Sequence, residues 1–357
     1  MKMSLRKLKS MLIIAAIAIA AASCKDDDEV NIVYVDGKLS FNLPEFIHPN
    51  EELKMIPTGL THPDGGEIGY YWKVNPTMSK FDTTRFLNGL DKNGRPSDGS
   101  FSFTFPDTLQ TYTVYCNAFS EDYSTSTLNL KTTVVSPGPG NSITGSGIFP
   151  SRDPYVKIDG NEYYYTLVGD LEWFRQDLAY TASGTPFRNS EAMDGVFGRF
   201  YTYEEAMTAC PEGWRLPTDA EWVSLVKAFH PYGDQDLVHK PMPGAAAKLM
   251  ADAYFNGVKM WGYWPAVGKL TNESLMGILP CGYANLGTPD ENGKYTSAQF
   301  IGTYEYSAHW TADMDENGMA YYRYIFGEQP DIMIGKGDTK TFGAAVRCVR
   351  KIENKQD

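Results

Sequence analysis

The chain has 357 residues, which is too long for one ordinary domain and predicts two or three. Its formal net charge of -12 argues against a nucleic-acid partner, because phosphate binding needs clustered Lys and Arg. Aromatic residues make up 13% of the sequence, so aromatic side chains available for recognition are expected on the surface.

Residues 1–23 have the pattern of an export signal. Basic residues come first, at Lys2, Arg6, Lys7 and Lys9. The apolar core that follows, residues 11–22, is too short for a stable membrane anchor. It ends in small residues before Cys24, and this run resembles a bacterial lipobox, which implies that Cys24 is lipidated and holds the protein to a membrane. Cleavage by an ordinary signal peptidase at the same residues is the alternative.

An acidic tether is expected from residue 24 to residue 37. Its segment 25–29 resembles the surface-export tag of Bacteroidetes lipoproteins, which implies an outer-membrane protein that faces the extracellular side. A solvated tether without a targeting role is the other interpretation, and both can hold together.

Residues 38–136 read as short strands separated by turn residues. The expected strands are 38–43, 52–56, 68–74, 99–105, 112–118 and 127–135. This spacing, with Trp72 near the middle, predicts an all-β immunoglobulin-like sandwich that serves as a spacer. Residues 100–118 resemble the end of a polycystic-kidney-disease-type repeat. Cys116 has no second cysteine in this domain, which favours a buried free thiol.

Two threonines in this region follow an aspartate. Thr83 and Thr108 lie in short Asp-Thr motifs that resemble the sites at which Bacteroidetes glycosylate exported proteins. Because such short motifs occur often by chance, the sequence leaves open whether either is modified. Residues 137–147 are rich in Pro and Gly and predict a linker.

Residues 148–352 form the second expected domain, followed by a tail at 353–357. Strands are expected at 163–168 and 173–178, with a polar loop at 182–198. Two capping boxes, Thr202 with Glu205 and Thr218 with Glu221, predict two short helices. Further elements are expected as a helix at 245–251, an irregular aromatic loop region at 261–310, and strands at 321–326 and 344–349.

The second domain resembles the Fibrobacter succinogenes major paralogous domain. The matching blocks are 169–173, 177–178, 201–206, 210–222, 279–283, 309–311 and 346–349. The block at 215–222 is also similar to formylglycine-generating and sulfatase-modifying domains. These resemblances imply an α+β C-type-lectin-like fold with a disulfide between Cys210 and Cys348, which would contribute about 5 kcal/mol. Two separately buried thiols are the alternative.

Enzyme chemistry is not expected. Formylglycine-generating activity needs a reactive cysteine pair, and the remaining Cys116 and Cys281 lie in different expected domains. The histidines show no metal-binding spacing, so no metal and no cofactor are expected. Asp313 and Asp315 lie in a stretch with several oxygens that could chelate calcium, but the spacing favours a solvated turn.

Ligand binding is expected at aromatic residues in the loop region. The candidates are Trp261, Tyr263, Trp264, Tyr304 and Tyr306. Their rings can stack on sugar rings or peptide side chains, or they can fill the core. The sequence therefore predicts an extracellular lipoprotein that binds a glycan or a peptide. The tag resemblance implies an accessory role beside a TonB-dependent transporter of the SusC type and its SusD-like lid. A structural or adhesive component without a small-molecule site is the alternative.

Overall fold

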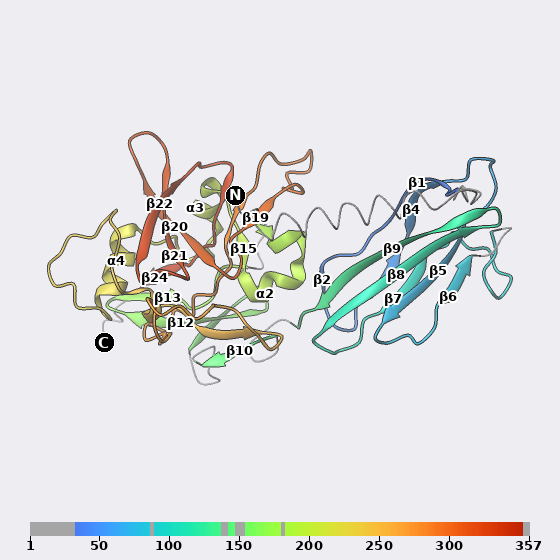
Figure 1. Ribbon diagram of the computed structural model, residues 1–357. Coiled ribbons are helices and arrows are strands. Elements are labelled where there is room, and N and C mark those ends of the chain that lie inside the picture. Colours follow the sequence, from blue (N-terminus) through green and yellow to red (C-terminus); the bar gives the residue numbers. More distant parts are fainter. Residues whose placement is uncertain (1–32, 86–88, 137–141, 147–153, 180–182, 353–357) are drawn as a thin grey trace, which may run out of the picture.

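Figure 1 shows the computed structural model, which describes residues 33–85, 89–136, 142–146, 154–179 and 183–352. The predicted signal sequence, the lipidation site Cys24 and the acidic segment lie outside the described residues, as does the C-terminal tail. None of the helices in the described ranges is long and apolar enough to cross a membrane.

The first part of the described chain is built from strands. They are β1 (Asp36–Phe41), β2 (Phe46–Ile47), β3 (Glu52–Met55), β4 (Pro57–Thr61), β5 (Gly69–Asn75), β6 (Asp82–Arg85), β7 (Phe101–Thr104), β8 (Thr111–Ser120) and β9 (Tyr123–Val134). They form a five-stranded sheet in the order β2-β9-β8-β5-β6 and the pairs β1-β4 and β3-β7. β2 runs parallel to β9, and the other neighbours are antiparallel.

One apolar core lies between these strands. Alternate residues of β8 are buried, because a strand places successive side chains on opposite faces. Trp72 on β5 is fully buried, and its indole N–H donates to the Gly99 carbonyl at 2.9 Å. Cys116 is a buried free thiol on β8, which confirms that prediction.

The later part of the chain contains further short strands. They are β10 (Ile143–Ser146), β11 (Tyr155–Ile158), β12 (Asn161–Val168), β13 (Leu171–Phe174), β14 (Thr185–Pro186), β15 (Arg199–Phe200), β16 (Asp252–Phe255), β17 (Val258–Lys259), β18 (Tyr283–Asn285), β19 (Gln299–Ile301), β20 (Tyr306–Met314), β21 (Ala320–Phe326), β22 (Ile332–Gly337), β23 (Phe342–Gly343) and β24 (Val349–Lys351). The sheets are β11-β12-β13-β24, β20-β21-β22, β19-β18-β23, β10-β16-β17 and β14-β15. The structure is therefore β-rich, as predicted.

Short helices pack beside these sheets (Figure 1). They are η1 (Phe187–Asn189), η2 (Glu191–Met193), α2 (Asp194–Phe197), α3 (Tyr203–Ala209), α4 (Asp219–Lys227) and η3 (Ala246–Lys248). Both predicted capping boxes are present at the starts of α3 and α4. Cys210 caps α3 and is bonded to Cys348, 138 residues away, which confirms the predicted disulfide.

Several expected elements differ in the structure. The predicted linker contributes β10, which pairs with β16 over its whole length. The expected helix at 245–251 is only η3, because Met250 pairs with Ile278 in a β-bridge that draws the chain out of a helix. The expected strand at 344–349 makes isolated bridges before β24 starts at Val349. The region expected to be an irregular loop contains the nine-residue strand β20.

Candidate functional site

The tryptophans separate into a buried set and one exposed residue. Six of the seven are buried, namely Trp72, Trp173, Trp214, Trp222, Trp261 and Trp310, whereas Trp264 is 42% exposed. Trp261 is fully buried, and its indole N–H donates to the Ile278 carbonyl at 2.9 Å. A ligand cannot reach the ring of Trp261 in this structure, so this candidate is a core residue.

Tyr263 and Trp264 lie together in an exposed turn. Tyr263 is 71% exposed. The Trp264 carbonyl accepts hydrogen bonds from the amides of Val267 and Gly268, at 3.1 and 3.0 Å, which closes the turn. A Cβ atom on Gly262 would lie 3.2 Å from the indole nitrogen of Trp264, so glycine lets the indole approach the backbone closely. These hydrogen bonds define the backbone that presents Trp264, and Tyr263 immediately precedes it.

Tyr304 and Tyr306 lie in a different segment, at the start of β20. Tyr304 is 39% exposed, and burial of its hydroxyl raises its pKa. Tyr306 is half-buried, and its ring stacks on Tyr324 with 4.9 Å between the centroids, so a neighbour already covers part of it. The structure therefore keeps Tyr263 with Trp264 and Tyr304 with Tyr306 in two separate segments.

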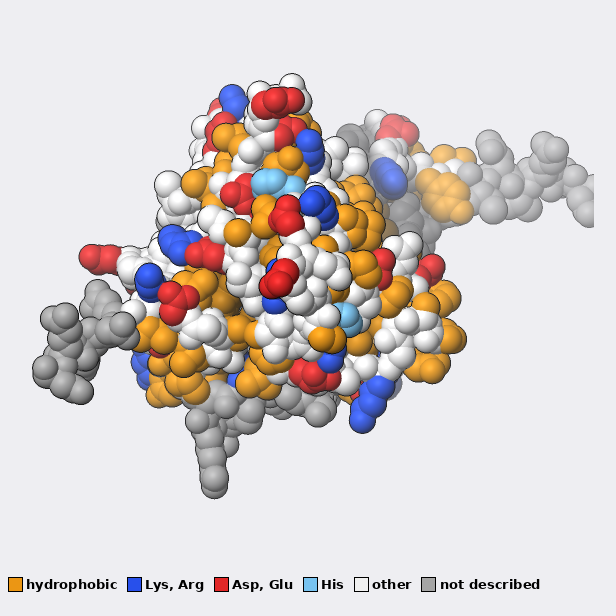
Figure 2. All heavy atoms as spheres, turned by 90° about the vertical axis from the view of Figure 1, so that its left-hand side faces the viewer, with side chains coloured by type: hydrophobic (Ala, Val, Ile, Leu, Met, Phe, Trp, Pro, Cys, Tyr) orange, Lys and Arg blue, Asp and Glu red, His pale blue; other side chains and the backbone are white. Residues whose placement is uncertain are grey.

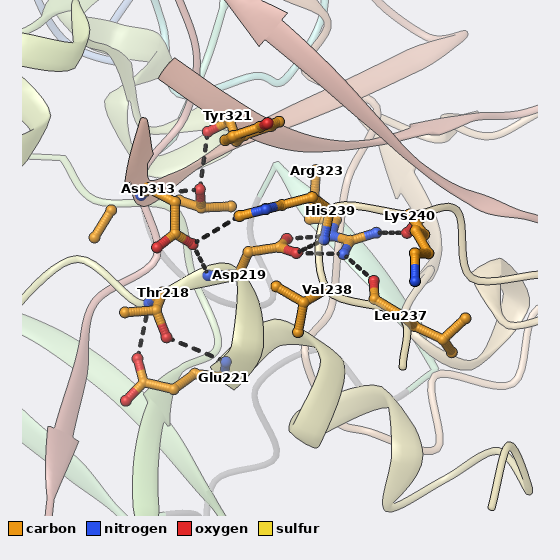
Figure 3. Close-up of polar contacts among 12 residues, drawn as sticks. Thr218, Asp219, Glu221, Leu237, Val238, His239, Lys240, Asp313, Tyr321 and Arg323 are labelled. Carbon is orange, nitrogen blue, oxygen red and sulfur yellow. Dashed lines mark hydrogen bonds and ion pairs between the residues drawn. The ribbon is translucent and has the colours of Figure 1, made fainter. Parts of the chain in front are cut away.

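A buried ion pair fastens α4 to the sheet β20-β21-β22 (Figure 3). The guanidinium of Arg323 on β21 donates from Nε and Nη2 to the two carboxylate oxygens of Asp219, the first residue of α4. Its nitrogens also donate to the carbonyls of Leu237 and Lys240. These hydrogen bonds of the Arg323 guanidinium thus go to Asp219 of α4 and to residues 237–240. The pair therefore positions that loop, and sequence reasoning missed it because the partners are far apart in the chain.

The same loop presents His239 at the surface (Figure 3). Its ring stacks on Tyr321 at 4.1 Å, and its Nε2 lies 3.6 Å from Asp313 Oδ2. Asp313 also accepts a hydrogen bond from the Asp219 amide, and Asp315 pairs with Lys336 at 2.8 Å. The two aspartates considered for calcium are thus engaged by protein donors. Among the described residues, no group of three or more His, Cys, Asp or Glu side chains is arranged to hold a metal ion.

A group of buried polar residues, linked by hydrogen bonds, includes Ser307 and His309 of β20. His309 Nε2 lies 2.8 Å from Asp177 Oδ1, and its Nδ1 lies 3.5 Å from Ser307 Oγ. Ser307 is fully buried, and Asp177 also accepts a hydrogen bond from Arg347. Cys281 lies 3.6 Å from Ser307, and burial raises the pKa of its thiol to about 12. The Cys281 thiol is therefore protonated at neutral pH. The hydrogen bonds among these buried polar residues link separate segments of the core.

A cleft of about 430 Å³ lies between β12, α2 and the segment that precedes β3. Its ionisable lining residues are His48, Glu162, Arg175, Asp177, Asp194 and Arg347. Arg175 is buried, its Nε donates to the Leu275 carbonyl at 2.8 Å, and burial with the nearby Arg347 lowers its pKa to about 10. This cleft was not predicted from the sequence, because its walls come from segments that are far apart in the chain.

Figure 2 shows one face of the molecule with acidic and basic side chains intermixed and groups of hydrophobic side chains between them. Charges of one sign do not dominate this face.

Comparison with known families identifies the later part of the chain. The model described as the Fibrobacter succinogenes major domain matches residues 167–350, which is just over half of the chain. No curated protein matches the chain. The match spans β13 to β24 and so includes the disulfide, both capping boxes, the buried ion pair and the exposed aromatic turn.

Proposed function

The chain belongs to the Fibrobacter succinogenes major domain family, and we propose that it is a surface-exposed outer-membrane lipoprotein that binds an extracellular glycan. In this proposal β1 to β9 form an immunoglobulin-like spacer, and the family domain has a C-type-lectin-like fold that carries the binding surface. Cys24 with its preceding small residues supports lipid anchoring, and the acidic segment after it supports export to the surface.

The exposed pair Tyr263 and Trp264 carries the binding proposal. Six tryptophans are buried in this protein, so an indole left 42% exposed beside a tyrosine that is 71% exposed needs a reason. Such rings offer apolar faces that stack on the C–H face of a sugar, with a polar edge left for hydrogen bonds. The turn is held by backbone hydrogen bonds, so the rings lose little backbone freedom on binding.

Affinity electrophoresis in gels containing soluble polysaccharides, combined with a glycan array, tests this function. Trp264→Ala and Tyr263→Ala should each weaken binding by about 2 kcal/mol, roughly thirtyfold, as for central aromatic contacts in other interfaces. Tyr155→Ala is the matched control, because this tyrosine is 46% exposed in a different strand. It should bind like the unmodified protein.

Other results of these binding experiments would point to a different function or ligand class. Negligible binding by every form, on glycan and peptide arrays alike, would favour a structural or adhesive component. Binding of peptides alone would keep the aromatic surface and change the ligand class.

The anchoring and partnership have their own tests. We expect Cys24→Ala to abolish metabolic labelling with a fatty acid, and external protease to reach the protein on intact cells. We also propose a role beside a TonB-dependent transporter and its SusD-like lid. A pull-down from native membranes that contains no such transporter would count against that role.

A further inference from the structure

The cleft beside α2 has the size and position of a small-molecule site. Its volume of about 430 Å³ falls within the usual range for ligand pockets, about 300–1,000 Å³. His48 lies on one wall, from the first part of the chain, and Asn161 and Asp194 line it from β12 and α2. Ligand sites often lie where such independently packed parts of a chain meet.

Asp194 brings an unused hydrogen-bond acceptor to this cleft. The residue is only 3% exposed, and Arg199 donates to Oδ2 from Nε and Nη2, at 2.9 and 2.7 Å. Its other oxygen, Oδ1, is buried and has no hydrogen-bond partner among the described residues. Buried acceptors in folded proteins are almost always satisfied by protein, water or ligand donors, so this oxygen offers a hydrogen-bonding position to a ligand in the cleft.

Two glycines in the lining shape the backbone of the cleft wall. Gly198 has a φ of 65°, and a Cβ there would lie 2.7 Å from the Asp177 Cβ and 2.8 Å from the Leu178 carbonyl oxygen. Gly277 has a φ of 60°. Other residues would be strained at both positions, so glycine lets the wall adopt this backbone.

The lining favours a neutral ligand rich in hydroxyl groups. Asp177 is engaged by Arg347 and His309, Asp194 by Arg199, and Glu162 by Lys157, so the acidic groups do not call for a cation. Asn161 and Gln176 also line the cleft, and their amide groups bond to the backbone of Asp159 and of Tyr164 and Glu162. Carboxylate and amide groups together accept and donate hydrogen bonds, which matches the alternating roles of sugar hydroxyls.

Contacts between the two parts of the chain hold His48 at the cleft. Phe46 packs against the rings of Phe187 and Phe255, with centroids 5.9 and 6.4 Å away. Ser190 Oγ donates to the Phe46 carbonyl at 2.9 Å, and Glu45 pairs with Arg188. His48, which follows Phe46 by two residues, therefore has a fixed place over α2.

We propose that this cleft binds a small neutral polyhydroxyl ligand about the size of one sugar residue, with Asp194 as acceptor and His48 beside it in the lining. The site is separate from the aromatic turn at Tyr263 and Trp264. It goes beyond the proposed function, and either can fail while the other stands.

Saturation-transfer NMR with a panel of free neutral monosaccharides tests the site. The protein is the full mature chain with Cys24→Ser, so that it stays soluble. We expect transfer to at least one sugar, and at least tenfold weaker binding by His48→Ala and Asn161→Ala. Both residues are only partly buried, so these variants keep the fold, which near-ultraviolet circular dichroism would verify. Asp194→Ala should abolish the transfer.

Controls separate the two sites. Tyr263→Ala and Trp264→Ala should bind the free monosaccharide like the parent chain. The proposal is overturned if no sugar in the panel shows transfer, or if His48→Ala and Asn161→Ala bind like the parent. It is also overturned if only the aromatic variants lose binding, or if a parallel panel of free amino acids shows transfer and the sugars do not.

Discussion

Two buried aspartates in the family domain differ in how their surroundings affect ionisation. Burial opposes the charge of Asp177, but Arg347 and His309 outweigh it and hold its pKa below the ordinary value. Burial raises the pKa of Asp194, and the neighbouring Arg199 and His48 do not reverse the shift, which Glu191 reinforces. The balance between burial and the neighbouring charges therefore has opposite signs at the two carboxyls, and Asp177 belongs to the scaffold.

The lowered pKa of Asp177 predicts a pH-dependent contribution to stability. A carboxyl whose pKa falls on folding stabilises the protein above its unfolded pKa, about 3.9. That contribution is lost as the pH falls through the lower folded value. Asp177→Asn should lower the free energy of unfolding by about 3–5 kcal/mol at neutral pH, because it leaves a buried charge unpaired.

Urea unfolding at several pH values measures this effect. The difference between the parent and Asp177→Asn should shrink as the pH is lowered below about 4. Asp170→Asn is the control, because Asp170 makes an exposed pair with Lys351 and should contribute little at any pH. A difference for Asp177→Asn that stays constant down to acid pH would contradict the assignment.

The two free thiols should resist alkylation in the folded protein. Burial raises the pKa of both Cys116 and Cys281 to about 12, so almost no thiolate forms near pH 8. Mass spectrometry after iodoacetamide treatment should show neither residue modified in the native protein and both modified in urea. Modification of Cys281 under native conditions would show that the core around Ser307 opens.

At the scale of elements, α4 is held by two ion pairs with opposite surroundings. Arg323 and Asp219 are almost fully buried, whereas Arg215 is 50% exposed where it pairs with Glu221. Arg323→Ala should lower the free energy of unfolding by about 3–5 kcal/mol, because the Asp219 carboxylate is left buried without a cationic partner and keeps only the hydrogen bond from the His239 amide. Arg215→Ala should cost less than about 1 kcal/mol. Similar costs for both variants, measured by chemical denaturation, would contradict this account.

The sequence predicted those elements that depend on residues close together in the chain. The caps of α3 and α4 depend on residues three apart, so Thr202 with Glu205 and Thr218 with Glu221 were visible directly. β20 was missed because residues Ser307 to Thr311 are all buried, and a strand buried on both faces has no alternating pattern.

The candidate site was predictable only in part. Tyr263 and Trp264 are exposed as a binding surface requires, but Trp261, three residues earlier than Trp264, is core. Composition cannot tell which of these two tryptophans is buried. Trp261 is held in the core by its hydrogen bond to Ile278, whereas Trp264 begins an exposed turn. The acceptor at Asp194 and its neighbour His48 come from distant segments, so spacing carried no information about them.

At the scale of the whole molecule, one covalent bond spans most of the family domain. The Cys210–Cys348 disulfide links residues 138 positions apart, so it restricts the unfolded chain strongly. Reduction should lower the free energy of unfolding by about 2–5 kcal/mol and lower the Tm. A variant with Cys210→Ser and Cys348→Ser is the control, since its Tm should not respond to reductant. Equal Tm values for the oxidised and reduced parent would contradict the prediction.

The position of the last strand also sets an order of events during synthesis. β24 pairs with β13, and Val349 exchanges two backbone hydrogen bonds with Arg215. Cys348 and Arg347 in the same short segment supply the partners of Cys210 and Asp177. Until residues 344–349 are made, β13 therefore lacks its partner strand, Cys210 lacks its disulfide partner and Asp177 lacks Arg347. The native contacts of the family domain are completed only when its last strand has been synthesised.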